Sequence, residues 1–342
     1  MEKWQILVKD SVINEEQLAK HILINKSDIR KVRNKYPMRI PHYYLNIIRN
    51  SALKLQAIPD IKELNDTKGY IDPLNEEGDS PVSNLTHRYP DRVLFLISGK
   101  CAMYCRFCTR KRKVGTKIII NNATINKGIN YIKSHTQIRD VILSGGDPLM
   151  LTDIKLEEII EKLRNIKHIE IIRIGTRIPC VLPQRITKKL CKMLKKYHPI
   201  YINTHFNHPD EITEESKKAC EMLADNGIPL GNQTVLLKGI NDSKEIINEL
   251  MRKLLTLRVK PYYLYQADLC RGTSHFKTKV ETGLEIISAL RGYISGIAVP
   301  NYVIDAPHGG GKIIISPENI VKTTNKGFIL KNYQGKYYKY PR

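Results

Sequence analysis

The sequence has no hydrophobic run of roughly 18 residues, the length that a membrane-spanning helix needs. Its N-terminus, Met1 to Gln5, opens directly into polar sequence without the apolar core of a signal peptide. These two absences predict a protein that does not enter the membrane, and we expect it in the cytoplasm.

Acidic residues are scarce, with 34 Asp and Glu against 56 Lys and Arg, which leaves a formal net charge of +22. Such a balance is typical of nucleic-acid-binding proteins. Here the lysines are spread along the chain and accompany many Ile and Asn, as an AT-rich genome produces. The 42% of hydrophobic residues can form a core, which excludes wholesale disorder and fibrous folds. We expect a globular protein that binds a small molecule rather than a nucleic acid.

A disulfide framework is not expected, because the seven cysteines are odd in number and unevenly spaced. Cys101, Cys105 and Cys108 lie within eight residues, and the other four are scattered. Clustered thiols in a reducing compartment are typical of a metal or iron–sulfur site. Three thiolates can hold three irons of a [4Fe–4S] cluster and leave one iron open. The alternatives are a structural zinc ion with His87 as a fourth ligand, or three thiols without metal.

Short apolar runs alternate with helical patterns from about residue 93 onward. Apolar residues recur at helical spacing over 156–163 and 246–254, and Asp242 with Glu245 forms a candidate capping box for the second of these helices. Six βα units predict an α/β fold with a parallel sheet, either doubly wound or curled into part of a barrel. The expected strands are 93–98, 140–144, 169–174, 200–204, 228–237 and 260–266.

The regions on either side of these units look different. Helices are predicted near 14–24 and 41–50, followed by an irregular acidic segment at 59–82, and the C-terminal region adds another apolar run and short strands. In a barrel of this type, ligands bind where the strands end, and the unusual polar motifs directly follow the apolar runs. The predicted parts are an N-terminal helical wrap, a barrel core and a C-terminal segment, at 1–85, 86–295 and 296–342.

Two glycine-rich motifs are candidate ligand-binding loops. Ser144-Gly145-Gly146-Asp147 follows the second run, and its glycines let a ligand approach the backbone, although an ordinary turn also fits. Gly309-Gly310-Gly311-Lys312 lacks the spacing of a P-loop. Its lysine is either a surface residue or the Schiff-base partner of pyridoxal phosphate. Arg88, Tyr89 and Arg92 precede the first run and are suited to bind the phosphate of that cofactor.

These motifs belong to a longer set of segments that occur in one register between about residues 30 and 335. The segments are 86–92, 101–110, 141–147, 173–177, 203–209, 231–237, 262–268 and 305–312. With them, the sequence resembles the lysine 2,3-aminomutases, a family of radical S-adenosylmethionine enzymes.

The resemblance implies a partial (β/α)6 barrel with an N-terminal helical extension and a C-terminal segment that carries Lys312. It implies that Cys101, Cys105 and Cys108 hold a [4Fe–4S] cluster, that S-adenosylmethionine binds the open iron, and that Lys312 holds pyridoxal phosphate. The implied activity is that of an isomerase that interconverts L-lysine and β-lysine. In that reaction a 5′-deoxyadenosyl radical takes a hydrogen from C3, and the amino group migrates from C2 to C3.

The resemblance also assigns the other site residues. Arg110 is expected to bind the substrate carboxylate, and Asp268 and Asp305 its ε-ammonium. The charges agree with this assignment, because two buried carboxylates repel one another unless a cation joins them. The residues assigned to the cofactor cleft are Arg88, Tyr89, Arg92, Ser144, Gly145, Gly146, Asp147, His205, Gln233 and Tyr265.

Two features depart from the family pattern. Bacterial members carry a longer C-terminal tail with three zinc-binding cysteines, and Ser243 stands where the fourth zinc ligand would be. We therefore expect no zinc, and the family's zinc-linked oligomer is in doubt, although a homo-oligomer stays open. His308 replaces a glycine of the lysine loop, which leaves the conformation of that loop to be determined.

Four alternative functions remain at this point: a glutamate 2,3-aminomutase, a β-lysine synthase that serves elongation factor P, a radical enzyme that modifies RNA, and a non-catalytic cluster-binding or redox protein. Asp268 and Asp305 favour lysine over glutamate, and Thr109 with Asp268 is more typical of the enzyme acting on free lysine. An RNA-modifying enzyme would leave Lys312 without a task. The expected partners are L-lysine and a reductase, flavodoxin or ferredoxin as electron donor.

Overall fold

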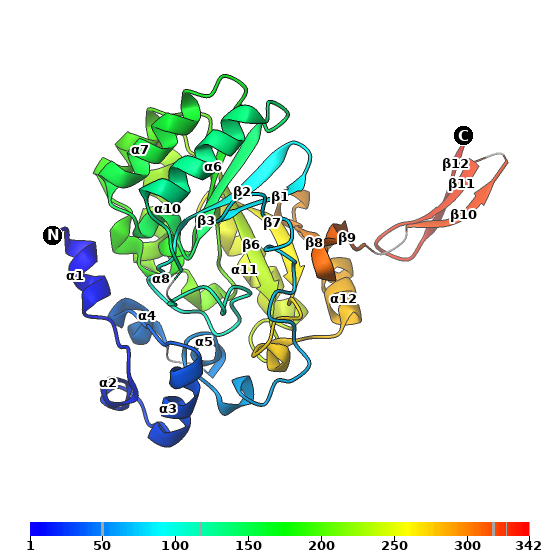
Figure 1. Ribbon diagram of the computed structural model, residues 1–342. Helices are drawn as coiled ribbons and strands as arrows, with labels where there is room; N and C mark the ends of the chain where they lie inside the picture. The colour runs from blue at the N-terminus through cyan, green and yellow to red at the C-terminus, as the bar shows by residue number, and fades with distance from the viewer. Residues whose placement is uncertain (49–50, 117, 317–318, 326, 342) are drawn as a thin grey trace.

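A single curved sheet forms the centre of the molecule (Figure 1). The computed structural model describes residues 1–48, 51–116, 118–316, 319–325 and 327–341. The sheet consists of β1 (Leu85–Tyr89), β2 (Arg92–Ser98), β3 (Asp140–Gly145), β4 (Ile171–Gly175), β5 (Ile200–Thr204), β6 (Leu230–Leu236), β7 (Val259–Gln266), β8 (Asn301–Ala306) and β9 (Gly311–Ile314). Neighbouring strands follow one another in chain order. β2 through β8 are parallel, and β1 and β9 add an antiparallel strand at each edge.

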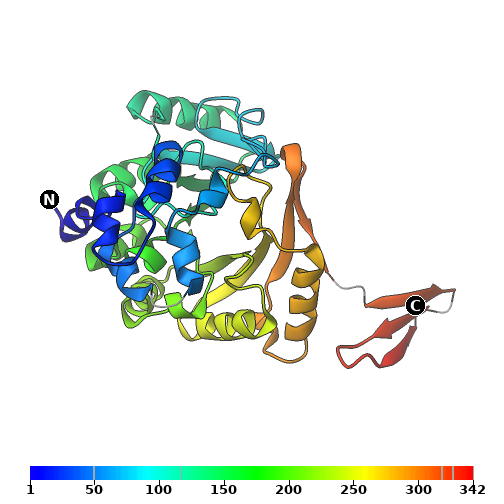
Figure 2. The same cartoon turned by 90° about the horizontal axis from the view of Figure 1, so that it is seen from below.

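Helices cover the outer side of the curl, which Figure 2 shows from below. In α7 (Asp153–Arg164) the apolar stripe faces the sheet, so that Leu156, Ile160 and Leu163 are fully buried. The other helices of the barrel are α6 (Asn122–Ser134), α8 (Ile178–Val181), α9 (Lys188–Lys195), α10 (Glu214–Asp225), α11 (Lys244–Thr256) and α12 (Val280–Leu290). Short 3-10 turns are η1 (Ile61–Glu63), η2 (Pro148–Met150), η3 (Pro183–Arg185), η4 (Pro209–Glu211), η5 (Ser274–Phe276), η6 (Gly296–Ala298) and η7 (Pro307–Gly309).

The predicted α/β fold class is confirmed, and all six predicted strands are present as β2 to β7 with ends within two residues of the prediction. The apolar run of the C-terminal segment forms β8. β1 was missed, because its sequence Leu-Thr-His-Arg-Tyr carries no apolar run. It is a strand because it pairs antiparallel with β2.

Three predicted helix boundaries differ in detail from those of the described residues. The N-cap of α11 is Ser243, whose side chain accepts a hydrogen bond from Ile246 N, whereas Asp242 accepts from Gly239 N. The predicted capping box of Asp242 and Glu245 therefore lies one residue too early.

The N-terminal helices differ from their predicted ranges. The helix predicted at 14–24 is shorter. Within the range predicted at 41–50 the structure describes α4, and residues 49 and 50 lie outside the described residues. The N-terminal helices are α1 (Lys3–Lys9), α2 (Glu15–Ala19), α3 (Lys26–Lys35), α4 (His42–Ile47) and α5 (Ser51–Ala57).

The N-terminal segment, blue in Figure 1, lies below the sheet and holds the loop that carries the clustered cysteines. Glu63 is fully buried and accepts hydrogen bonds from the Arg106 guanidinium and the Lys111 ammonium of that loop. Arg106 Nη1 also donates to Pro37 O at 2.9 Å. Burial alone raises the pKa of Glu63, but Arg106 and Lys111 outweigh it, so that the pKa lies below its usual value. A buried carboxylate between two cations thus fixes the cysteine loop.

The C-terminal residues form a separate antiparallel sheet of β10 (Ile320–Thr324), β11 (Gly327–Lys331) and β12 (Tyr337–Pro341). Figure 1 shows this small sheet standing away from the barrel. The predicted short strands of the C-terminal segment are therefore present. Within the described ranges, no helix has the length and apolar character to cross a membrane.

The substitution Glu63→Gln should lower the free energy of unfolding by about 3 to 5 kcal/mol, because two buried cations lose their carboxylate. Urea unfolding at pH 7 measures the change. Glu170→Gln serves as the control, since the pair of Glu170 and Arg139 is exposed, and should cost less than about 1 kcal/mol. An unchanged unfolding midpoint for Glu63→Gln would contradict the role of this buried cluster.

Candidate active site

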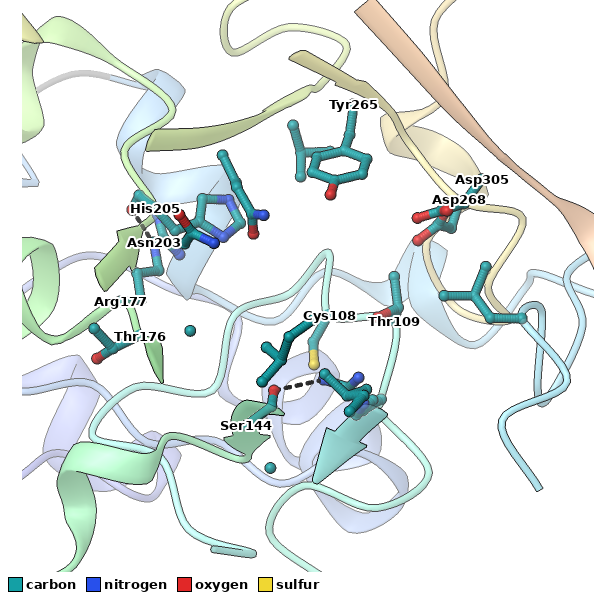
Figure 3. Close-up of a pocket in the computed structure, with 18 of the residues that line it drawn as sticks. Cys108, Thr109, Ser144, Thr176, Arg177, Asn203, His205, Tyr265, Asp268 and Asp305 are labelled. Carbon is teal, nitrogen blue, oxygen red and sulfur yellow. Dashed lines mark hydrogen bonds between the residues drawn. The ribbon is translucent and has the colours of Figure 1, made fainter. Parts of the chain in front are cut away.

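A large cavity runs along the inner face of the curved sheet, and Figure 3 shows part of it. Its volume is about 730 Å³. It reaches from Arg92 and Asp140, where β2 and β3 begin, to Ser144 and Gly175 near the carboxyl ends of β3 and β4. All residues that the sequence analysis assigned to the site line this cavity. The parallel strands thus bring together motifs that lie far apart in the sequence.

The cysteine loop follows β2 and forms one wall of the cavity. Cys101, Cys105 and Cys108 are free thiols with intermediate burial. Arg177 Nη1 donates a hydrogen bond to Cys105 Sγ at 2.8 Å. Among the described residues, no group of three potential metal ligands has the arrangement that would bind a single metal ion. In a four-iron cluster each thiolate binds its own iron, and three accessible thiols around one cavity fit that group.

The two glycines of the motif at the end of β3 let it pass close to the cysteine loop. Gly145 has φ at 142°, and a Cβ there would lie 2.1 Å from Ser98 O. A Cβ on Gly146 would lie 2.4 Å from Lys100 O. Only glycine fits both positions, so the backbone of this motif is held against the loop and lines the cavity beside Ser144.

Asp147, the last residue of this motif, binds protein groups on both carboxylate oxygens. It accepts hydrogen bonds from Thr176 Oγ1 at 2.8 Å, from Arg177 N at 2.8 Å and from Leu149 N at 3.0 Å. Burial raises its pKa to about 6. The sequence analysis assigned Asp147 to cofactor binding; it lines the cavity and fixes the loop that follows β4, and its contact with a cofactor stays a prediction.

The lysine loop places Lys312 at the start of β9, opposite the end of β8. Its backbone N–H donates to Tyr89 Oη at 2.9 Å, and its Nζ lies 3.1 Å from Asp305 Oδ1. His308 adopts a left-handed conformation with φ at 59°, which a glycine would adopt more easily. It is held by a hydrogen bond from its N–H to Pro73 O and by edge-on contact of its ring with Tyr70. The replacement of glycine by histidine is therefore accommodated.

The three residues predicted to bind a phosphate all line the cavity, and Tyr89 contacts this loop. The Arg92 guanidinium lies over the Tyr89 ring, 3.8 Å from its centroid. Arg88 Nε donates to Asp79 Oδ2 at 2.7 Å, which fixes the side chain. Two cations and a phenol near Lys312 form a suitable environment for the phosphate of pyridoxal phosphate.

Two carboxylates, Asp268 and Asp305, lie side by side in the cavity wall (Figure 3). Burial and the neighbouring Asp305 raise the pKa of Asp268 to about 7. Asp305 pairs with Lys312. Lys312 offsets part of the negative charge of the two carboxylates, and a cationic group of a ligand beside Asp268 would offset the rest.

Arg110 is fixed by a residue that the sequence analysis missed. Glu76 is buried and binds the Nε and Nη2 edge of Arg110, at 2.8 and 2.6 Å, while Arg110 Nη1 donates to Ser144 Oγ at 3.3 Å. Glu76 also pairs with Arg112 at 3.2 Å. It belongs to the segment predicted as irregular and acidic, and its acidic character was the only signal that pointed to it.

The remaining predicted residues lie on the inner face of the sheet or just beyond it. Burial and Arg177 lower the pKa of His205 to about 3, so its ring is neutral at pH 7. Burial and Asp305 raise the pKa of Tyr265, so its phenol stays protonated. The Tyr265 ring centroid lies 5.5 Å from Lys312 Nζ, and Gln233 on β6 lines the same cavity.

A curled parallel sheet, with three cysteines after its first parallel strand and a glycine motif after the second, is typical of radical S-adenosylmethionine enzymes. Residues 95–250 match the family model described as "Radical SAM superfamily". Residues 287–342 match the model described as "Lysine-2,3-aminomutase". Residues of both matched regions line the cavity: the cysteine loop lies in the first region and Lys312 in the second.

Several relatives cover nearly the whole chain. The L-lysine 2,3-aminomutase of Fusobacterium nucleatum is 51% identical over 97% of this chain and 80% of its own. That of Clostridium subterminale is 50% identical over 97% and 82%, and the glutamate 2,3-aminomutase of Clostridioides difficile is 45% identical over 98% and 81%. The solved structure of native anSMEcpe with bound AdoMet aligns with 57% of each chain at 12% identity and a TM-score of 0.45. The chain belongs to the lysine 2,3-aminomutase family.

The stabilising effect of Glu76 should depend on pH. Burial raises the pKa of Glu76, but Arg110 outweighs it and the pKa falls from 4.5 to about 2. The carboxylate therefore stabilises the fold above about pH 4.5, and this contribution is lost as the pH falls towards 2. Relative to the unaltered protein, Glu76→Gln should lose about 3 kcal/mol at pH 7 and much less near pH 3, measured by urea unfolding.

Glu77→Gln is the matched control, because Glu77 is the next residue and its side chain is mostly exposed. It should change the free energy of unfolding by less than about 1 kcal/mol at either pH. A loss for Glu76→Gln that is the same at both pH values would show that the charge of Glu76 is not what holds Arg110.

Proposed function

We propose that this protein is an isomerase that interconverts L-lysine and β-lysine. The observation that carries the proposal is the pair of neighbouring, half-buried carboxylates, Asp268 and Asp305, in the same cavity as the guanidinium of Arg110. A site with a cation for a carboxylate and two carboxylates for an ammonium suits a diamino acid. The names of the relatives from Fusobacterium nucleatum and Clostridium subterminale agree with this substrate.

Three bound groups would complete the proposed site. When bound, the [4Fe–4S] cluster and S-adenosylmethionine supply a radical that removes a hydrogen atom from carbon, and pyridoxal phosphate supplies the carbonyl that carries the migrating nitrogen. Cys101, Cys105 and Cys108 would hold the cluster. Lys312 would hold pyridoxal phosphate covalently through Nζ. Two of the phosphate ligands would be Arg92 and Tyr89, beside the lysine loop.

The protein's own groups then orient the substrate. Glu76 binds one edge of Arg110 and leaves the Nη1 edge, beside Ser144, for the substrate carboxylate. Asp268 would take the ε-ammonium, and the incoming cation would lower the raised pKa of that carboxyl. Asp305 would give the same ε-ammonium a second carboxylate, and its Oδ1 lies 3.1 Å from Lys312 Nζ in the structure.

Glutamate is the second candidate substrate, because a glutamate 2,3-aminomutase is 45% identical to this chain. The charges of the site disfavour it. Glutamate would place its own side-chain carboxylate beside Asp268 and Asp305, and three like charges in a buried place repel one another. Asp268 and Asp305, which would face the side-chain end of the substrate, therefore distinguish lysine from glutamate.

We further infer a small electron-transfer protein or reductase as the source of the electron, and a homo-oligomer stays open. The cytoplasm is the compartment that suits free thiols and a cluster. The division into an N-terminal wrap, a core and a C-terminal segment at 1–85, 86–295 and 296–342 stays a prediction.

Anaerobic assays with both amino acids test the proposed substrate. The reconstituted protein should form β-lysine from L-lysine and at most traces of β-glutamate from L-glutamate, as measured by mass spectrometry. Replacing Asp268 and Asp305 by Asn should reduce kcat/KM for lysine at least about 100-fold, because a buried ammonium loses its charged partners at roughly 1.5 to 3 kcal/mol each. Faster turnover of glutamate than of lysine by the unaltered protein would contradict the proposal.

The role of Lys312 is tested by spectroscopy, independently of turnover. Pyridoxal phosphate bound covalently to a lysine absorbs visible light, and Lys312→Ala should lose that band while it keeps the iron–sulfur absorbance. Lys322→Ala is the control, because Lys322 lies in β10, outside the barrel, and should leave the band intact. A band of full intensity in Lys312→Ala would assign the cofactor to another lysine.

A further inference from the structure

Arg177 contacts the cysteine loop and has no task in the proposed reaction so far. It belongs to the Gly175-Thr176-Arg177 motif after β4, and its side chain is buried. Its Nη1 donates to Cys105 Sγ at 2.8 Å, and its Nε donates to the backbone oxygen of His205 at 3.3 Å. Figure 3 shows Arg177 beside Thr176 and His205 at the cavity wall. A cation therefore lies against one of the three thiols that line the cavity.

The position of this cation is fixed from several directions. Arg177 Nη2 donates at 2.7 Å both to Gln56 Oε1 and to Glu211 Oε1. Its backbone N–H donates to Asp147 at 2.8 Å, and the Phe107 ring centroid lies 5.0 Å from its Cζ. These partners come from α5, η4, the motif after β3 and the cysteine loop. A planar guanidinium can satisfy such divergent partners at once, whereas the ammonium of a lysine cannot.

We propose that Arg177 sets the reduction potential of the iron–sulfur cluster through its charge and its hydrogen bond to Cys105. The inference rests on the proposed function, which assigns the cluster to Cys101, Cys105 and Cys108. Reduction adds one negative charge to a cluster and its thiolates. Hydrogen bonds to the ligand sulfur and nearby charge are among the factors that set the potential of such a cluster. A cation at Cys105 stabilises the reduced state and makes the potential less negative.

Glu211 limits this effect. Its side chain is fully buried and its Oε1 lies 2.7 Å from Arg177 Nη2, so its negative charge offsets part of the charge of the guanidinium. Tyr44 and Gln56 also donate hydrogen bonds to Glu211 Oε1. The potential would then depend on the balance of the two charges. Removing the cation and removing the carboxylate should shift it in opposite directions.

The test is a redox titration of the reconstituted cluster in the absence of S-adenosylmethionine, followed by electron paramagnetic resonance. Arg177→Met should lower the equilibrium constant for one-electron reduction at least about tenfold, which is a shift of about 59 mV to more negative potential. Arg177→Lys keeps the positive charge but loses the several N–H donors of the guanidinium. It should shift the potential in the same direction by a smaller amount. Glu211→Gln should shift the potential to less negative values.

Arg185→Met is the matched control. Arg185 is also fully buried and paired, with Asp153, but its hydrogen bonds go to Leu149 O and Leu151 O rather than to a cysteine. This variant should lose stability and keep the potential of the unaltered protein. The comparison separates an effect on the cluster from a general effect of removing a buried arginine.

Equal potentials for the unaltered protein, Arg177→Met and Glu211→Gln would overturn the proposal, as would an equal shift for Arg185→Met and Arg177→Met. If Arg177→Met assembles no cluster, the sign of the shift in Glu211→Gln decides: a less negative potential supports the proposal, and no shift overturns it. A failure of the unaltered protein to assemble a [4Fe–4S] cluster would instead overturn the proposed function, and this role with it.

Discussion

The parallel pairing of β2 through β8 is the constraint on which the rest of the molecule depends. Because neighbouring strands follow the chain order and the sheet curls, Cys101 after β2 and Asp305 in β8 line the same cavity although about 200 residues separate them. The inner face is not filled by aliphatic side chains. Tyrosines such as Tyr263 and Tyr265 and the pair of Arg173 and Asp140 line it and leave about 730 Å³.

A second regularity concerns charge. In a chain with a net charge of +22, the cations that face the site each have a carboxylate that fixes them. The six pairs are Arg88 with Asp79, Arg92 with Asp91, Arg110 with Glu76, Arg173 with Asp140, Arg177 with Glu211 and Lys312 with Asp305. A long cationic side chain loses rotamer entropy when it is held, so these carboxylates prepare the cations for their ligands before any ligand arrives. Asp268 differs, because burial and Asp305 raise its pKa and a ligand's ammonium would complete the site.

The sequence could predict what a short pattern encodes. Periodic apolar runs gave the six parallel strands, and the cysteine and glycine motifs gave residues that the structure brings into one cavity, although their individual roles stay predictions. What depends on distant partners was missed. Glu76 lies in a segment without periodicity and acts only because folding places it against Arg110. Arg177 stood in a recognised motif, but its contact with Cys105 requires the loops after β2 and β4 to meet. β1 was missed because it is a strand only by virtue of its antiparallel pairing with β2, which its own sequence does not reveal.

The central claim is that one cavity combines a reducible cluster, S-adenosylmethionine and a pyridoxal phosphate lysine to rearrange L-lysine. The measurement that tests it most directly is the ratio of β-lysine formed to S-adenosylmethionine consumed, in an anaerobic reaction of the reconstituted protein with a chemical reductant. Because S-adenosylmethionine would act as a cofactor that each turnover restores, β-lysine should accumulate in large molar excess over S-adenosylmethionine lost. Equimolar loss of S-adenosylmethionine, or deoxyadenosine released while lysine is untouched, would contradict the account.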